Sequence, residues 1–264
     1  MSEKTEQIKK NVVSALERHF DFWGIDKETG LLSKYKIKDK SLRFAGYPHV
    51  GDNYADQNVR VVIVGADLGS DELRNENNGF GSYHTFETKK EKLPSLFEKC
   101  YFHMAGTYAT VIYLLRKRFP KLFSALYDDQ ASMNDGITAL RAIKRLYGVP
   151  TEELKGSFAM TNLHKFVTEG REPKAGAENR RWLDSKEEYE FLKDELLALE
   201  PTIVVFQELK SGDYLDNTQI EDLKKTLKGC TIVKLRHPSS REKGGYQLYK
   251  DIVMKIEDAF MQNC

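Results

Sequence analysis

Three polar residues of different chemical type lie at the ends of apolar segments: Asp67 after VVIVGA, Asn162 within FAMTNLHKF, and His237 after TIVKLR. A carboxylate can position water and balance positive charge, an amide offers a donor and an acceptor, and a neutral imidazole can donate an N–H to a developing oxyanion. Hydrolysis of an N-glycosidic bond to a pyrimidine needs all three functions, because the departing base gains negative charge while the sugar becomes oxocarbenium-like. Asp67, His237 and Asn162 could supply these three functions in such a reaction.

The segments that carry these residues alternate with helical patterns. The predicted strands are residues 59–66, 156–163, 202–206 and 230–235, and the predicted helices are 93–119, 135–147, 185–199, 220–227 and a closing helix marked by Leu248, Ile252, Ile256 and Phe260. Apolar strands that alternate with helices are typical of a parallel sheet covered on both sides. We expect an α/β fold, a three-layer α/β/α sandwich with a central, mainly parallel four-stranded sheet. Ligands of such folds bind beyond the carboxyl ends of the strands, here GADLGSDE, TNLHKF, QELK and RHPSS.

A single domain of residues 1–264 is expected, with a core at 59–261 and an N-terminal helix and irregular extension at 1–58. Helical spacing joins the apolar residues from Ile8 to Trp23, and Ser2 could cap this helix. The remainder of the extension, from residue 26, is polar and contains glycine, so we expect irregular structure there, with KYKIKDK as a solvated edge. Asp184, with Glu187 three residues later, predicts a capping box at the start of the helix at 185–199.

Composition limits the possible partners. The chain has 264 residues, of which 40% are hydrophobic, enough for a sizeable core. Its 41 basic and 40 acidic side chains nearly cancel, so any affinity for nucleic acid must come from local clusters. The stretch MSEKTEQIKK has no apolar targeting segment, and the longest apolar run is too short to cross a membrane. We expect a cytoplasmic monomer with no membrane partner.

In their order and spacing, VVIVGADLG, FAMTNLHKF, PTIVVF and LRHPSS resemble motifs of the uracil-DNA glycosylase superfamily over residues 59–253. Members of this superfamily follow the first strand with a short glycine-led motif, carry an asparagine on the second strand, and place H-P-S before a loop that probes DNA. The resemblance implies a DNA glycosylase that excises a base and leaves an abasic site. It implies catalytic roles for Asp67, Asn162 and His237, and a base pocket that includes Gly65, Ala66 and Gly69.

Two departures from the motifs of the superfamily bear on the substrate. Leu68 stands where most relatives have proline, which leaves the geometry of the first loop open. Gly69 stands where the uracil-specific branch has a tyrosine that crowds the 5-position of the base, so the resemblance implies room for a larger pyrimidine. We expect the substrate to be uracil or a 5-modified pyrimidine, excised for base-excision repair or for defence against modified foreign DNA.

Flanking residues supply candidate contacts to the DNA substrate, which can be double- or single-stranded and carries a damaged or modified base. An extruded base needs an aromatic platform, for which Phe80 and Tyr83 are candidates. Ser239, Ser240 and Arg241 are expected to enter the minor groove and hold the gap left by the base. Phosphate contacts are expected from four basic residues of one loop, Lys165, Arg171, Arg180 and Arg181.

Each assignment has a structural alternative. Asp67 could cap the next helix, Asn162 could bond the backbone at the sheet end, and His237 could be an ordinary loop residue. The aromatic residues could belong to the core, and the basic residues could form solvated surface.

No cofactor or metal is expected. The three cysteines, Cys100, Cys230 and Cys264, cannot supply the four thiolates of the iron–sulfur cluster that some relatives carry, and the sequence has no zinc-deaminase motif. A non-catalytic DNA-binding relative on the same scaffold is the main alternative function. An unrelated nucleotide-binding domain, with VGADLG as a phosphate loop, ranks lower because the sequence has no G-x-G-x-x-G or G-x-x-x-x-G-K-[ST] pattern.

Overall fold

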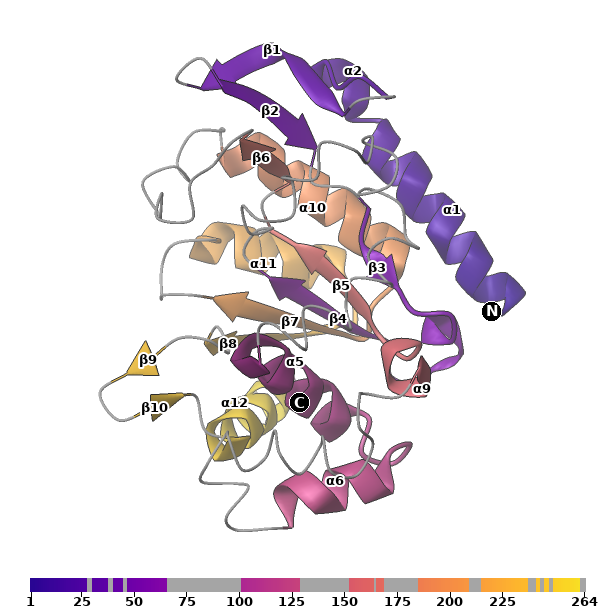
Figure 1. Ribbon diagram of the computed structural model, residues 1–264, viewed down its shortest axis with the longest axis vertical. Coiled ribbons are helices and arrows are strands. Elements are labelled where there is room, and N and C mark those ends of the chain that lie inside the picture. The colour runs from indigo at the N-terminus through magenta and orange to yellow at the C-terminus, as the bar shows by residue number, and fades with distance from the viewer. Residues whose placement is uncertain are drawn as a thin grey trace.

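A computed structural model of the chain describes residues 1–27, 30–37, 40–44, 47–65, 101–128, 152–163, 165–168, 185–208, 215–236, 241–242, 245–246 and 249–261 (Figure 1). In these ranges the chain forms an α/β fold, built on a mixed five-stranded sheet with helices on both faces. None of the helices in the described ranges is both long and apolar enough to span a membrane.

The central sheet has the strand order β3–β5–β4–β7–β8. Its strands are β3 His49–Val50, β4 Val61–Gly65, β5 Ala159–Asn162, β7 Ile203–Glu208 and β8 Thr231–Arg236. β4, β5, β7 and β8 run parallel to one another, and they lie at the four segments predicted as strands. β4 is buried along its whole length, because apolar side chains on both of its faces enter packed cores.

The expectation of a four-stranded sheet is wrong, because β3 adds a fifth strand that runs antiparallel to β5. β3 pairs His49 with Met160 and Val50 with Ala159. A strand of two residues is too short to show the two-residue periodicity from which a strand can be predicted. By pairing with β5, β3 covers backbone groups that would otherwise form an exposed sheet edge.

Helices pack on both faces of the central sheet (Figure 1). They are α1 Glu3–Glu17, α2 Phe20–Trp23, α5 Tyr101–Leu114, α6 Pro120–Tyr127, α9 Glu152–Lys155, α10 Ser185–Leu199, α11 Asn217–Thr226 and α12 Tyr249–Met261. On one face, α1, α10 and α11 share a buried apolar cluster with Val62 and Val64 of β4. On the other face, α5, α6 and α12 share a second cluster with Val61 and Ile63. Alternate residues of β4 therefore enter opposite cores.

The predicted helices agree best with the structure at α10, which spans the predicted residues, and the closing helix corresponds to α12. α11 begins at Asn217, earlier than predicted. The cause is a capping box, in which Asp216 accepts from the backbone of Gln219 and the Gln219 side chain accepts from the backbone of Asp216. The capping box predicted at Asp184 lies outside the described residues, as does the helix predicted at 135–147.

The long helix predicted at 93–119 does not continue to its predicted end. Its described part, α5, ends at Leu114, and a turn leads through Phe119 into the separate helix α6. Proline disfavours helical backbone at the residue before it but fits the first position of a new helix. Pro120 therefore ends one helical pattern and begins the next.

The N-terminal helix is capped as predicted, but it is shorter. The backbone N–H of Thr5 donates to Ser2 Oγ at 3.3 Å, and α1 ends at Glu17 instead of continuing to Trp23. The last apolar residues of the pattern form the separate helix α2, which ends where Gly24 adopts left-handed backbone with φ 65°. Apolar side chains of both helices lie in the same buried cluster as residues of β4 and β5.

The remainder of the extension, expected to be irregular, forms strands. These are β1 Leu31–Ile37 and β2 Lys40–Phe44, a hairpin that β6 Phe166–Thr168 joins to make a second, three-stranded sheet of order β1–β2–β6. The described part of KYKIKDK lies mainly in β1, an edge strand of this sheet. Within this segment, lysines alternate with Tyr35 and Ile37, which is the period of a strand. The segment was expected to be irregular because its composition is polar, and this alternation was not used to predict a strand.

Candidate functional site at the carboxyl edge of the sheet

The parallel strands of the central sheet end at one edge, named here the carboxyl edge (Figure 1). It is formed by Gly65 of β4, Asn162 of β5, Glu208 of β7 and Arg236 of β8. After β4 the chain places β5 on one side of it, and later places β7 on the other side. Ligands of α/β sheets bind at such a reversal of strand order, beyond the carboxyl ends. The ends of β4 and its neighbours are therefore where this fold favours a site.

Asn162 and Gly65 lie side by side at the carboxyl edge. They are register partners in neighbouring parallel strands, and Leu163 N donates to Gly65 O at 2.8 Å, which extends the pairing past the strand end. A Cβ atom on Gly65 would lie 3.1 Å from Asn162 Oδ1, closer than most Cβ contacts. Asn162 is 8% exposed, so its amide has little room to move aside. The absence of a side chain at Gly65 thus leaves space for the amide of Asn162.

Gly65→Ala is expected to displace the Asn162 amide, because a Cβ atom at this position would lie 3.1 Å from Asn162 Oδ1. Gly65 is not among the glycines with positive φ, so alanine disturbs this contact and not the backbone. The measurement is the chemical shift of the Asn162 side-chain amide signals in NMR spectra. Signals that stay unchanged in Gly65→Ala would show that the amide is not held against Gly65.

Gln207 places a second amide on the other side of Gly65. β7 pairs with β4 so that Phe206 lies beside Val64, and Gln207 follows beside Gly65. Gln207 is 2% exposed, and its Nε2 donates to Thr107 Oγ1 of α5 at 3.0 Å. One hydroxyl uses only part of the hydrogen-bonding capacity of a primary amide. The sequence analysis named the strand end QELK but not Gln207, whose signal is a polar residue directly after the apolar run IVVF.

Asn162, Gly65 and Gln207 form one row on the face of the sheet that α5 covers. Phe158 and Met160 pack into the core on this face, so the alternation along β5 puts Asn162 there too. Gln207 is on this face because it bonds α5. The row therefore carries two amides, separated by a glycine, at the reversal of strand order. Amides can both donate to and accept from the planar edge of a pyrimidine.

Lys165 is predicted from the sequence to contact DNA phosphates, and the structure shows this prediction to be wrong. Lys165 is 2% exposed, and its Nζ forms an ion pair with Glu195, which is 0% exposed. The same Nζ donates to Thr161 Oγ1 at 2.8 Å, and Thr161 Oγ1 donates to Glu195 Oε2 at 2.8 Å. A lysine held in this way cannot reach a phosphate. Its place at the start of a charged, glycine-containing stretch gave no sign of its burial.

The other predicted site residues divide into two groups. Arg241 begins the two-residue strand β9 Arg241–Glu242, which pairs with β10 Gly245–Tyr246 in a hairpin after β8 (Figure 1). The rest lie outside the described residues: Ala66, Asp67, Gly69, Phe80, Tyr83, Arg171, Arg180, Arg181, His237, Ser239 and Ser240.

Two residues of the second group directly continue described strands, since Ala66 follows Gly65 and His237 follows Arg236. β5 neighbours β4, whereas β8 is the second strand from β4 on the other side. With neighbouring strands about 4.8 Å apart, the end of β8 is roughly 10 Å from the end of β4. The described chain therefore brings Gly65 and Asn162 together, and it places the end of β8 across the edge from them.

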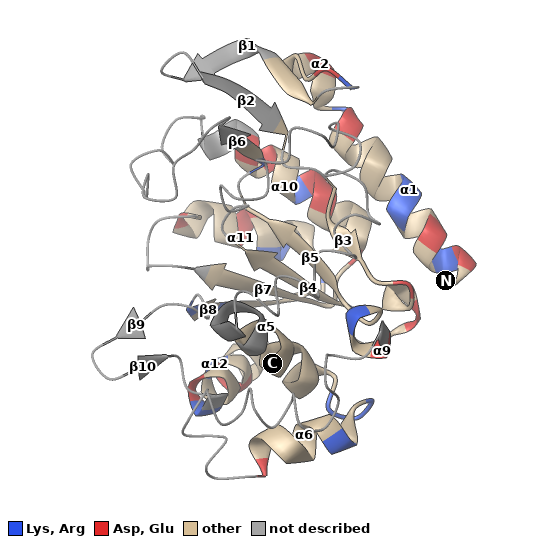
Figure 2. Ribbon diagram, in the orientation of Figure 1, with Lys and Arg blue, Asp and Glu red and all other residues tan. Residues whose placement is uncertain are grey.

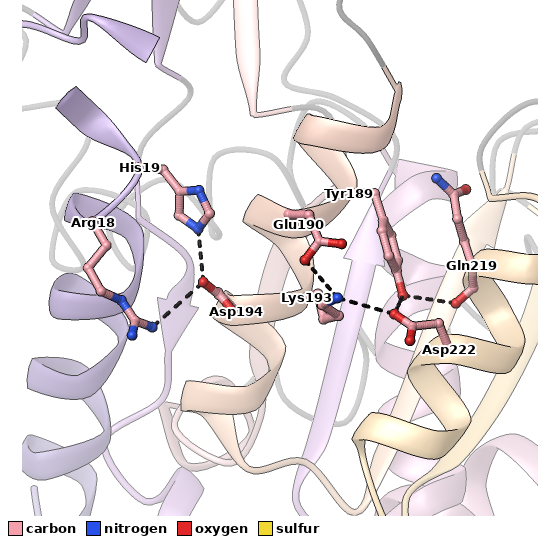
Figure 3. Close-up of polar contacts among 8 residues, drawn as sticks. All are labelled: Arg18, His19, Tyr189, Glu190, Lys193, Asp194, Gln219 and Asp222. Carbon is pink, nitrogen blue, oxygen red and sulfur yellow. Dashed lines mark hydrogen bonds and ion pairs between the residues drawn. The ribbon is translucent and has the colours of Figure 1, made fainter. Parts of the chain in front are cut away.

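Charged groups on the outer helices join the helices to one another (Figure 3). Lys193 of α10 lies 2.6 Å from Glu190 and 3.2 Å from Asp222 of α11, and Tyr189 Oη donates to Asp222 at 2.7 Å. Burial, followed by the hydrogen bond to Asp222, raises the pKa of Tyr189. Hydrogen bonds from Tyr189 and Lys193 lower the pKa of Asp222. These contacts stabilise the packing of α10 on α11.

Asp194 joins α10 to the turn after α1. Its Oδ2 lies 3.0 Å from His19 Nε2 and 3.6 Å from the guanidinium of Arg18 (Figure 3). Basic and acidic residues are mixed along α1 and α10, so these two helices present no continuous basic surface (Figure 2).

Comparisons of the chain with protein-family models, with curated proteins and with solved structures found no match. Within the described ranges, no group of three or more His, Cys, Asp or Glu side chains is placed to hold a metal ion. The case for a function therefore rests on the motifs and on the geometry of the carboxyl edge.

Proposed function

We propose that this protein is a DNA glycosylase, which hydrolyses the N-glycosidic bond of a flipped-out uracil or 5-modified pyrimidine and leaves an abasic site. One observation carries the proposal: the amide of Asn162 lies against Gly65 at the carboxyl edge, and Asp67 follows Gly65 by two residues in the chain. With it we propose the finer fold, a three-layer α/β/α sandwich of the uracil-DNA glycosylase type, extended by β3. The likeness of GADLG, TNLHK and HPSS to that superfamily supports both proposals.

Asn162 binds the base in this mechanism. A pyrimidine such as uracil presents a carbonyl beside an N–H group, and a primary amide can pair with both. The base must first leave the stack, because its edge is not accessible in a duplex. Burial of Asn162, which is 8% exposed, strengthens its hydrogen bonds relative to those made in water.

Asp67 and His237 supply the chemistry of bond cleavage. The carboxylate orients a water molecule whose oxygen bonds to the anomeric carbon, while the bond from this carbon to the base breaks and its electron pair leaves with the base. The N–H of the neutral imidazole stabilises the charge that develops on the base oxygen. The attacking water releases a proton by way of the carboxylate to solvent, and the base anion takes up a proton from solvent.

The substrate and the DNA contacts follow from the flanking residues. Gly69 leaves the 5-side of the base open, which favours a 5-modified pyrimidine beside uracil, and Phe80 or Tyr83 stacks on the extruded base. Ser239, Ser240 and Arg241 enter the minor groove. The protein acts as a cytoplasmic monomer on double- or single-stranded DNA.

Labelled oligonucleotides test the function directly. Duplexes and single strands carry uracil, hypoxanthine, a 5-hydroxymethylpyrimidine or a glucosylated pyrimidine, and each product is treated with alkali. Alkali-labile sites are expected at uracil or at a 5-modified pyrimidine. Binding without alkali-labile sites would instead indicate a non-catalytic DNA-binding relative, and the absence of both binding and cleavage would contradict the proposal.

Charge reversal of Arg180 and Arg181 to glutamate is expected to weaken binding to DNA of any sequence and to flatten its salt dependence. The slope of log K against log[salt] is negative. Each lost phosphate contact should reduce its magnitude by about 0.9 on duplex DNA, because fewer counterions are released. The measurement is Kd at several salt concentrations. An unchanged slope would show that these arginines face away from DNA.

The matched control for this experiment is the charge reversal of Lys117 and Lys121 to glutamate. Both lysines are exposed in the region where α5 gives way to α6. The neighbouring Arg118 pairs with Glu153 of α9, which precedes β5, at 2.9 Å. This region therefore lies toward the amino ends of the strands, and the control should leave the salt slope unchanged.

A further inference from the structure

A network of polar side chains is buried directly behind the strand end that carries Asn162. Thr161 and Lys165 are each 2% exposed, Glu188 is 7% exposed and Glu195 is 0% exposed. Lys165 Nζ contacts Glu195 and Thr161, and the backbone N–H of Lys165 donates to Glu188 Oε1 at 2.5 Å. Glu188 and Glu195 are seven residues apart on α10, which puts them on one face of that helix two turns apart.

Stability alone does not account for this network. Burying two charges costs desolvation energy that their attraction often fails to offset, and an apolar pair of similar volume is frequently as stable or more stable. Glu195 Oε1 adds to this cost, because it is buried without a hydrogen-bond partner among the described residues. What an ion pair of this kind can provide is a single, defined geometry.

The geometry that the network defines is that of the strand end. Thr161 directly precedes Asn162, and Lys165 follows it by three residues, so α10 holds the chain on both sides of Asn162. The side chain of Thr161 faces α10, so that of Asn162 faces the opposite side of the sheet. The contacts named for this network do not use the side chain of Asn162. The network therefore acts on the backbone around Asn162 and leaves its amide available to a ligand.

We propose that Lys165, Glu195 and Glu188 are positioning residues, which clamp the end of β5 to α10 and thereby set the position of the Asn162 amide at the carboxyl edge. The role of the clamp in catalysis rests on the proposed function, whereas the clamp itself does not. Catalytic and binding groups need to be held within about half an ångström of their productive geometry. A strand end that is followed by a loop meets this requirement only if it is anchored.

The test replaces the ion pair with apolar side chains in the variant Lys165→Met/Glu195→Leu, which removes both charges and keeps similar volume. The matched control, Lys224→Met/Glu221→Leu, makes the same kind of exchange at an exposed ion pair of α11. Both variants are expected to unfold cooperatively, with thermal midpoints close to that of the wild type. Hydrogen exchange at the Leu163 amide, which donates to Gly65 O, is expected to become at least about tenfold faster in the first variant only. This variant removes the side-chain part of the clamp and keeps only the backbone contact of residue 165 with Glu188.

Single-turnover excision gives the second readout. The rate of Lys165→Met/Glu195→Leu is expected to fall by about 10- to 100-fold, because displacement of a binding group by about 1 Å can cost this much. The same pair of substitutions should cause less than about a twofold loss in an Asn162→Ala background, since groups that act through one another are not additive. An equal loss in both backgrounds, or a wild-type rate in the first variant, would overturn the positioning role.

The two proposals fail in different ways. If the wild-type protein excises no base, the proposed function fails, and the exchange of the Leu163 amide still decides whether the clamp exists. If the wild-type protein excises a base but Leu163 exchange is unchanged in Lys165→Met/Glu195→Leu, the clamp is wrong and the function stands. A thermal midpoint that falls sharply in this variant, with unchanged Leu163 exchange at lower temperature, would mean that the pair only stabilises the fold.

Discussion

Asp67→Asn is expected to lower the single-turnover rate of base excision by about two orders of magnitude or more, while the affinity for DNA stays largely unchanged. The asparagine keeps the size and polarity of the side chain. It removes the negative charge that balances the oxocarbenium-like sugar, and it orients the attacking water less well. Because both contributions act mainly in the transition state, the loss falls on the rate and not on Kd.

Single-turnover rates and Kd values on one uracil-containing duplex provide the measurement. Asp56→Asn is the matched control, because Asp56 is an exposed carboxylate in the short helix Tyr54–Asp56 that precedes β4. It therefore lies toward the amino end of β4, away from the carboxyl edge. An Asp67→Asn rate equal to that of the wild type would remove Asp67 from the mechanism.

The elements with long, regular apolar patterns were predictable from the sequence. VVIV in β4 and TIVVF around β7 are apolar on both faces, and such runs flanked by helices indicate buried parallel strands. α10 repeats apolar residues at helical spacing from Tyr189 to Leu199. In these elements, local pattern and tertiary packing favour the same structure.

The elements that were not predicted depend on partners far away in the sequence. β3 exists because it pairs with β5, more than 100 residues later, and two residues carry no pattern of their own. β2 pairs with β6 across a similar distance. A single sequence shows composition and period, but it does not show which distant segment will satisfy the backbone of a short strand.

The same distinction applies to the candidate site. Asn162 could be found because it ends an apolar strand within a recognisable motif. Lys165 was misjudged because its burial depends on Glu195, 30 residues later, and an isolated lysine in a charged stretch looks like solvated surface. Gln207 was overlooked because its importance lies in its position beside Gly65, which only the strand order reveals.

His237→Ala is expected to cost roughly 2 to 4 kcal/mol of transition-state stabilisation, the range seen when one preorganised donor to a developing oxyanion is lost. The loss should be the same on matched, mismatched and single-stranded substrates, because the donor acts after the base has entered the site. The fold should survive, since the substitution leaves every residue of β8, Thr231–Arg236, unchanged. His237→Gln, which retains an N–H donor, is expected to recover part of the rate.

Arg241→Ala provides the contrast, because Arg241 begins the β9–β10 hairpin after β8 and is expected to act on base extrusion. Extrusion of a base costs more from a well-paired duplex than from a mismatch or a single strand. The loss of excision rate in Arg241→Ala should therefore be largest on the matched duplex, smaller on the mismatch and smallest on the single strand. Single-turnover rates of both variants on the three substrates separate a chemical role from an extrusion role. A His237→Ala rate equal to that of the wild type would make the HPSS stretch a structural strand end and remove the main chemical support for glycosylase activity.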